Sequence, residues 1–210
     1  MERARIAELL QPFTAGAELP DALLGQLQLY LELLLRWNAR INLTAVRDPE
    51  QIVARHFGES LFAARVLLPD LNVEPLTLAD VGAGAGFPGI PMRLLAPHVR
   101  LTLIESQNKK ATFLREVVRA LQLEGVEVFC GRVEQWGSTA DIVALRAVEK
   151  FQRVLPVAAN AVARPGRLCL LIGAPQVPAT RRAADEGWRW AEPVAIPGSA
   201  GRVVLVAERT

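Results

Sequence analysis

Residues 78–91, LADVGAGAGFPGIP, decide how this chain folds. The apolar run 76–81 in front of the glycines is typical of a short buried strand. Pro88 suits the first turn of a helix, where its missing N–H costs nothing. Between strand and helix, three glycines stand at alternate positions: Gly82, Gly84 and Gly86. Strand, glycine turn and helix form the unit with which Rossmann-like folds bring backbone close to a nucleotide.

Downstream of this unit, apolar segments of strand length alternate with helical segments. Strands are predicted at 76–81, 100–105, 125–130, 141–145, 167–172, 190–196 and 202–208. Helices are predicted between them at 88–96, 107–122, 133–137, 149–164 and 178–186. This alternation indicates a mostly parallel seven-stranded sheet with helices on both faces. The linker 197–201 is too short for a helical crossover, so the last strand should be antiparallel.

The first part of the chain lacks this alternation. Residues 1–36 are predicted to be helical because leucines recur at helical spacing, and Asp21 after Pro20 is a suitable helix start. Residues 37–62 are less regular, and Asn38 and Asn42 suit a helix end and a loop. We expect an N-terminal helical cap over residues 1–66, packed in one compact unit on a Rossmann-like domain over residues 67–210.

Composition narrows the class of protein. A hydrophobic share of 51% and a charged share of 22% exclude bulk disorder. The net charge of +2 says little about partners, and the preference for arginine over lysine suits phosphate contacts as well as it suits genome composition or thermal adaptation. Cys130 and Cys169 stand alone in apolar segments, which favours small core residues in a reducing compartment and argues against a metal site. With no signal peptide and no apolar run of membrane length, we expect a soluble cytoplasmic protein that is not bound to a membrane.

The carboxyl ends of the predicted parallel strands should form the ligand crevice. The first strand brings Asp80 and the glycine turn there, the second Glu105, the third residues 131–134 and the fourth Arg146. Glu105 follows Gly86 by 19 positions, the offset expected of a carboxylate that binds both ribose hydroxyls. These spacings make Asp80, Gly82 and Glu105 candidate cofactor residues, and a carboxylate that only caps the loop is the other interpretation of Asp80.

Two nucleotide cofactors fit these features. The spacing Gly84-x-Gly86-x-x-Gly89 matches the dinucleotide pattern, so a nicotinamide oxidoreductase stays open. S-adenosylmethionine is the second candidate, and an Asp ahead of the glycines suits its sulfonium cation better than a phosphate. The only tyrosine, Tyr30, lies in the predicted cap, so the Tyr-x-x-x-Lys dyad of many hydride-transfer enzymes is missing. These grounds favour S-adenosylmethionine, with S-adenosylhomocysteine as product.

Several short motifs together resemble one family. They are Asn42-Leu-Thr44, His56 followed by Ser60-Leu61, the glycine stretch from Asp80 to Pro91, Lys110-x-x-Phe-Leu114, Arg132-Val-Glu134 and Arg146-Ala147. In this combination and order they resemble the bacterial RsmG (GidB) family, which methylates N7 of a guanine in small-subunit (16S) ribosomal RNA. The resemblance runs from about Trp37 to Arg167, and it implies the Rossmann-like fold of S-adenosylmethionine-dependent methyltransferases.

The resemblance also implies a set of site residues. Gly82 and Phe87 would line the cofactor, Gly84 and Gly86 would allow close backbone approach, and Glu105 would hold the ribose. Val133 and Glu134 would meet the adenine, largely through backbone. The candidate catalytic residues are Arg146, at the junction of cofactor and substrate, and Asn42, Thr44 and His56, at the edge of the cap facing the same cleft. Guanine N7 carries a lone pair and no proton, so the reaction needs no general base.

The implied partner is 16S ribosomal RNA or the 30S subunit, bound by a monomer. Four basic residues of the helix after the second strand are candidates for RNA contact, with a solvated helix face as the other interpretation: Lys109, Lys110, Arg115 and Arg119. A methyltransferase for a small molecule or a protein, and a non-catalytic RNA-binding assembly factor, remain alternatives.

The chain departs from the family pattern at two places. Glu59 stands where the family commonly has Asp, which keeps the charge. The fifth strand ends Leu171-Ile172-Gly173, where the family commonly has Leu-Lys-Gly. A lysine expected near the cleft is therefore missing, and three arginines are candidates to replace it: Arg153, Arg164 and Arg167.

Overall fold

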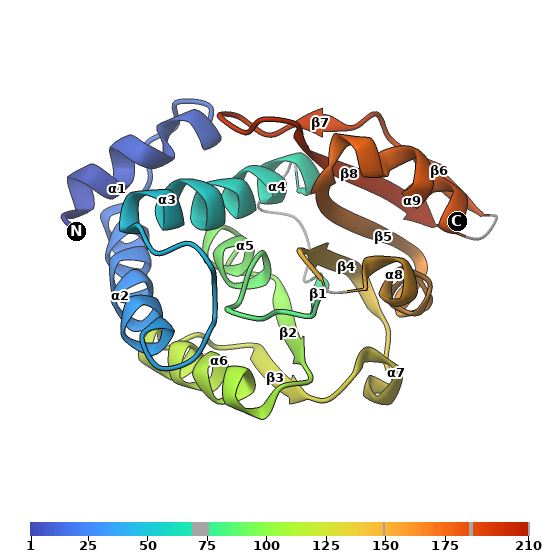
Figure 1. Ribbon diagram of the computed structural model, residues 1–210, viewed down its shortest axis with the longest axis horizontal. Helices are drawn as coiled ribbons and strands as arrows, with labels where there is room; N and C mark the ends of the chain where they lie inside the picture. The colour runs from blue at the N-terminus through green and yellow to red at the C-terminus, as the bar shows by residue number, and fades with distance from the viewer. Residues whose placement is uncertain (69–75, 149, 185–186, 210) are drawn as a thin grey trace.

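A twisted sheet with helices on both faces forms the centre of the computed structural model (Figure 1), which describes residues 1–68, 76–148, 150–184 and 187–209. Its strands are β1 (Thr77–Val81), β2 (Arg100–Glu105), β3 (Val126–Cys130), β4 (Ala140–Arg146), β5 (Val162–Gly173), β6 (Trp188–Trp190), β7 (Val194–Ala195) and β8 (Arg202–Arg209). The strand order is β3-β2-β1-β4-β5-β8-β6, and β7 also pairs with β8. Because β1 lies near the middle and its neighbours are β2 and β4, the carboxyl ends of these three strands meet at one edge.

Strands β1 to β5 run parallel, and β8 runs antiparallel to β5, β6 and β7, as the sequence predicts for the last strand. The prediction of one strand over 190–196 is wrong, because this segment forms two short strands, so the described sheet has eight strands rather than seven. Pro193 lies between the two, and proline has no N–H for the ladder. The register also shifts by one residue, from Trp190 opposite Ala207 to Val194 opposite Val204.

The helices of the α/β part lie where the alternation predicts them, except that the predicted helix 149–164 is wrong beyond residue 160, because the next strand already begins at Val162. They are α5 (Gly89–Leu95), α6 (Asn108–Ala120), α7 (Val133–Trp136), α8 (Phe151–Asn160) and α9 (Val177–Ala183), which follows the short 3-10 turn η3 (Ala174–Gln176). Residues 149, 185 and 186 of the predicted helices lie outside the described residues. Alternate strand residues face opposite layers: Leu78 joins the apolar cluster on the side of α5 and α6, and Ala79 the cluster on the side of α8.

The cap is helical through most of its length. It comprises α1 (Arg3–Leu10), the 3-10 turn η1 (Gln11–Phe13), α2 (Asp21–Asn38) and a continuous helix made of α3 (Pro49–Ile52), the π-helical segment η2 (Val53–Gly58) and α4 (Glu59–Leu67). The predicted irregularity over 37–62 is therefore wrong beyond residue 48. Asp48 accepts a hydrogen bond from the Gln51 N–H at 2.8 Å and Pro49 occupies the first turn, which together start this helix.

Cap and sheet share one apolar core. Ile6, Leu27 and Tyr30 of the cap belong to the same cluster of buried side chains as Leu78 of β1 and Leu103 of β2. Figure 1 shows the cap helices curving around the side of the sheet that α5 and α6 also cover. Residues of the cap and of the carboxyl ends of β1, β2 and β4 also line one cavity, which is described below. In the part of the chain that the structure describes, no helix has both the length and the apolarity to cross a membrane.

Candidate active site

The glycine turn after β1 is held by hydrogen bonds from both sides. Gly82, Gly84 and Gly86 have φ values of +71°, +58° and +91°, which favour glycine. The N–H groups of Gly82 and Ala83 donate to the Ile104 carbonyl of β2 at 2.9 and 3.0 Å. From the cap, the buried Tyr30 hydroxyl donates to the Ala85 carbonyl, and the Tyr30 ring stacks on Phe87 with centroids 5.4 Å apart. Contacts from β2 and from the cap thus hold the turn in place.

Glu105 joins this turn to the start of α6. Its Oε2 accepts the Gly84 N–H at 2.9 Å, and its Oε1 accepts the Gln107 N–H at 2.7 Å. Only 5% of the residue is exposed, and it lines the cavity described below. Each carboxylate oxygen has a second lone pair, so the side chain can still accept hydroxyl groups from a ligand.

The roles predicted for Asp80 and Gly86 at the cofactor are wrong. Asp80, predicted to contact cofactor, is fully buried beneath the turn and does not line the cavity; its Oδ2 accepts the Gly89 N–H at 2.8 Å at the start of α5. It acts as the loop-capping carboxylate that was its other interpretation. Gly86, predicted to allow close approach of the cofactor, instead allows close approach of Tyr30 of the cap and Ile90 of α5, because an added Cβ would lie within 2.5 Å of both side chains.

A cavity of about 660 Å³ opens beside the glycine turn, within the size range of small-molecule sites. Its walls come from the cap, the turn, the ends of β2 and β4, the segment 131–134 and the start of α8. Ten of the predicted site residues line it: Thr44, His56, Gly82, Gly84, Phe87, Glu105, Lys110, Val133, Glu134 and Arg146. The sequence therefore identified residues from both parts of the chain that the fold brings to one place.

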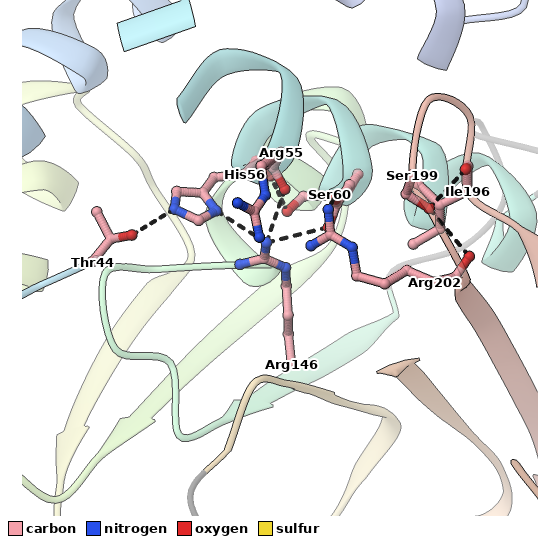
Figure 2. A network of polar contacts seen from close by, with 9 residues as sticks. Thr44, Arg55, His56, Ser60, Arg146, Ile196, Ser199 and Arg202 are labelled. Atoms are coloured by element: carbon pink, nitrogen blue, oxygen red, sulfur yellow. Dashed lines mark hydrogen bonds and ion pairs between the residues drawn. The ribbon is translucent and has the colours of Figure 1, made fainter. Parts of the chain in front are cut away.

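A chain of polar contacts crosses one wall of this cavity (Figure 2). His56 Nε2 lies 2.7 Å from Thr44 Oγ1, and its Nδ1 lies 3.0 Å from Arg146 Nη2. The same guanidinium nitrogen lies 2.8 Å from the Arg55 carbonyl oxygen and 3.2 Å from Glu59 Oε2, so its two hydrogens are shared among these two acceptors and His56. Glu59 Oε1 pairs with Arg202 at the start of β8. This series of polar contacts thus links the cap to β4 and β8 of the sheet.

Burial controls the charges in this network. Desolvation, followed by the charge of Arg146, lowers the pKa of His56 to about 3, so the imidazole is neutral at physiological pH. Desolvation raises the pKa of Glu59, while Arg146 and Arg202 act in the opposite direction. Glu59 is only 2% exposed and lies between two guanidinium groups, which compensates the buried charge.

A second hollow, of about 390 Å³, adjoins the cavity and shares Gln107 and Lys110 with it. Lys109 and Asn42 line this hollow and not the cavity, so the prediction that Asn42 faces the main cleft is wrong. The Asn42 amide oxygen accepts from Arg47 at 3.1 Å, which occupies it structurally.

The basic residues of α6 do not form one face. Arg115 and Arg119 are exposed and lie roughly 140–180° around the helix axis from Lys110. They line neither the cavity nor the adjoining hollow. Of the four residues predicted to contact RNA, only Lys109 and Lys110 therefore border a concave surface at the site.

Some residues of the site were missed or left open by the sequence. Tyr30 carried a signal, a hydroxyl within a leucine stripe, but its partner Ala85 could not be known. Pairing of Glu59 with Arg202 has no local signal, because the two residues lie far apart in the sequence. Of the arginines considered for the missing lysine, Arg153 lines the cavity, whereas Arg164 and Arg167 lie at the other end of β5. Lys150 also lines the cavity and was not predicted.

Comparison with known proteins places these features in context. The model of a family described as rRNA small subunit methyltransferase G (GidB) matches residues 23–187. A ribosomal RNA small subunit methyltransferase G of Streptococcus agalactiae serotype V is 40% identical over 162 residues, which cover 74% of this chain and 68% of that protein. One from an Exiguobacterium species is 42% identical over 157 residues, 72% of this chain and 64% of that protein. The chain thus spans about two thirds of the length of these relatives.

Solved structures with the same fold are more distant in sequence. The magnesium protoporphyrin IX methyltransferase of Synechocystis PCC 6803, solved with bound SAM, aligns with a TM-score of 0.65 at 16% identity and covers 92% of this chain and 99% of its own. A ribosomal protein L11 methylase of Lactobacillus delbrueckii subsp. bulgaricus gives a TM-score of 0.60 at 16% identity, over 73% of this chain and 79% of its own. These likenesses confirm the predicted fold class.

Proposed function

The chain belongs to the rRNA small subunit methyltransferase G family, and we therefore propose that it transfers a methyl group from S-adenosylmethionine to N7 of a guanine in small-subunit ribosomal RNA. One observation carries this proposal. A single cavity brings the glycine turn and Glu105 together with Thr44, His56 and Arg146, so a cofactor half and a substrate half face each other.

The cofactor half suits the adenosyl part of S-adenosylmethionine. Glu105 keeps lone pairs for the two ribose hydroxyls, while Gly82 and Gly84 present backbone without a Cβ. Val133 and Ile104 also line the cavity and offer apolar contact to a flat base. When bound here, S-adenosylmethionine supplies a methyl group made electrophilic by the sulfonium.

The substrate half suits a reaction without a general base. The N7 lone pair forms the new bond to the methyl carbon while the carbon–sulfur bond breaks toward sulfur, so no proton is transferred. His56 fits this chemistry because it is neutral, 7% exposed and engaged on both ring nitrogens, and is therefore not free to abstract a proton. The task of the site is to hold N7 in line with the methyl–sulfur bond, and such positioning can account for roughly 7–11 kcal/mol of a barrier.

The hollow beside the cavity is the proposed path of the RNA backbone. Arg40, Arg47, Lys109 and Lys110 line it, and no acidic side chain does among the described residues. Arg47 is occupied by Asn38 and Asn42, which leaves Arg40 and the two lysines as candidate phosphate ligands. Lys110 also lines the cavity, so a phosphate bound there would lie next to the target nucleotide.

The assembly and the compartment follow from this proposal. One chain supplies every wall of the cavity, so we propose that a monomer acts on the ribosomal particle or on its RNA. Small-subunit RNA as substrate implies that the protein works in the cytoplasm.

The proposal is tested with tritiated S-adenosylmethionine and purified 30S particles or naked 16S RNA from a strain that lacks the family enzyme. We expect label in one guanine of the RNA, and the two substrates show whether assembly is needed. Label in a protein or a small molecule of the extract would favour those substrates instead. RNA binding without label, while calorimetry shows that S-adenosylmethionine binds, would favour a non-catalytic assembly factor.

A further inference from the structure

The Thr44 backbone is held in place by one buried side chain of the cap. Asn38 is 4% exposed and ends α2. Its Oδ1 accepts the N–H groups of Leu43 and Thr44 at 2.9 and 3.0 Å, and its Nδ2 donates to the Thr44 carbonyl at 3.1 Å. Three hydrogen bonds from one amide therefore fix the position of Thr44 at the cavity wall.

The contact with Arg146 favours one tautomer of the neighbouring imidazole. A guanidinium group can donate but not accept, so His56 Nδ1, 3.0 Å from Arg146 Nη2, must be the acceptor. A neutral imidazole then carries its hydrogen on Nε2. Since Nε2 lies 2.7 Å from Thr44 Oγ1, His56 donates to the threonine hydroxyl (Figure 2).

These contacts leave the Thr44 hydroxyl free to donate one hydrogen bond. Its oxygen accepts from His56 and also from the Val46 N–H at 3.1 Å, which uses both lone pairs. Within residues 1–68, 76–148, 150–184 and 187–209, no group accepts the hydroxyl hydrogen, and Thr44 lines the cavity. The hydroxyl can thus act toward a ligand as a donor only.

A donor with no acceptor capacity distinguishes guanine from adenine next to N7. Guanine presents the O6 acceptor beside N7, whereas adenine presents the N6 amino donor at the same place. We propose that the Thr44 hydroxyl donates to O6 of the target guanine and that the Asn38–Thr44–His56–Arg146 chain sets this specificity. The inference rests on the proposed function, and it leaves N7 itself unbonded and available to the methyl group.

The test is a thermodynamic cycle in which the Thr44 hydroxyl and guanine O6 are removed singly and together. The guanine methylated by the wild-type protein is mapped first, and the RNA is then assembled by ligation with guanine or 2-aminopurine, which keeps N7 and lacks O6, at that position. Methyl transfer is measured for the wild type, Thr44→Val, which removes the hydroxyl, and Thr44→Ser, which keeps it. Calorimetric S-adenosylmethionine affinities within about twofold of the wild type confirm that the variants are folded.

We expect wild-type kcat/KM to fall about tenfold to hundredfold when 2-aminopurine replaces guanine. Thr44→Val should lose as much on guanine RNA and nothing further on 2-aminopurine RNA, because the same hydrogen bond is already absent. Thr44→Ser should stay within about threefold of the wild type. A difference in intrinsic reactivity of the two bases affects both proteins equally and cancels in this cycle.

Either of two results would overturn this inference and leave the proposed function standing. In the first, the loss caused by Thr44→Val and the loss caused by 2-aminopurine add in full. In the second, the wild-type protein methylates the guanine and 2-aminopurine RNAs at equal rates, a comparison that needs no variant. A wild type that places no methyl group on guanine N7 contradicts the proposed function itself, so the two failures can be told apart.

Discussion

Two carboxylates that end neighbouring strands have different environments. Asp80 is fully buried, and its Oδ1 has no hydrogen-bond partner. Glu105 lies at the cavity and accepts two backbone hydrogen bonds. Burial raises the pKa of Asp80 to about 7, opposed by the Gly89 N–H and by Arg146 and supported by Glu105. Their positions at strand ends predict cofactor contact for both carboxylates. Burial removes Asp80 from the cavity and leaves Glu105 as the candidate.

The pKa of Asp80 predicts a pH-dependent stability. Since its folded pKa of about 7 exceeds the ordinary value of 3.8, the folded state binds more protons between these values, and the free energy of unfolding falls as pH rises through them. Asp80→Asn mimics the protonated form, so the variant should match the wild type near pH 4 and exceed its stability by up to about 4 kcal/mol at pH 8. Urea unfolding at a series of pH values measures this difference. A difference that does not change with pH would contradict the account.

Glu105 should matter for cofactor affinity more than the other carboxylate of the cavity. Glu105→Ala removes the support of the glycine turn together with the ribose acceptor, and calorimetry should show S-adenosylmethionine affinity reduced by at least about tenfold. Glu134→Ala is the matched control, because its contact to adenine is expected through backbone, and affinity should change by less than about threefold. Equal losses in the two variants would contradict the assignment of Glu105.

At the scale of elements, helix α6 divides its basic residues between two surfaces. Lys109 and Lys110 border the site, while Arg115 and Arg119 point elsewhere. Replacing both lysines by alanine should reduce the slope of log affinity for RNA against log salt by about 1.5, because two phosphate contacts are lost. The paired Arg115→Ala and Arg119→Ala variant should leave the slope unchanged. A loss of slope in that control would show that the RNA crosses the opposite face of the helix.

The π-helical segment η2 ends at Gly58, which packs closely against the Phe13 ring. A Cβ on Gly58 would lie 2.5 Å from the Phe13 ring, so Gly58→Ala should lower the free energy of unfolding by about 1–3 kcal/mol. Gly25 in α2 is the control, since its added Cβ meets only the flexible end of Arg3, at 3.3 Å. Gly25→Ala should be neutral or stabilising by up to about 1 kcal/mol. Thermal or urea unfolding that ranks the two variants in the reverse order would contradict this packing.

The sequence predicts elements whose cause is local and misses those whose cause is a distant contact. The glycine turn, the helices of the α/β part and the antiparallel last strand follow from periodicity, glycine spacing and linker length. The sequence does not predict the helix 49–67, because residues 37–62 show no regular apolar spacing. Within this helix, Gly58 packs against Phe13 and His56 contacts Arg146, and both partners are distant in the sequence. The family resemblance places Asn42 at the main cleft, and the sequence does not show that Arg47 occupies its amide oxygen.

At the scale of the whole molecule, the cap is part of the same core as the sheet. Leu27 and Tyr30 share a buried cluster with Leu78 and Leu103, and the Glu59–Arg202 ion pair joins the cap to β8. We propose that the boundary near residue 66 separates two elements of one cooperative unit. Calorimetry should therefore record one unfolding transition, with equal calorimetric and van't Hoff enthalpies. Two resolved transitions would show that the cap unfolds on its own.

The central claim is that this cavity directs methyl transfer to guanine N7 in small-subunit RNA, and nucleoside mass spectrometry of the product RNA tests it most directly. RNA from a strain lacking the family enzyme is incubated with the protein and S-adenosylmethionine, digested and compared with untreated RNA. The account predicts one new 7-methylguanosine per RNA molecule and no other new methylated nucleoside. Methylation of another atom or base, or no new methylated nucleoside under conditions where S-adenosylmethionine binds, would contradict it.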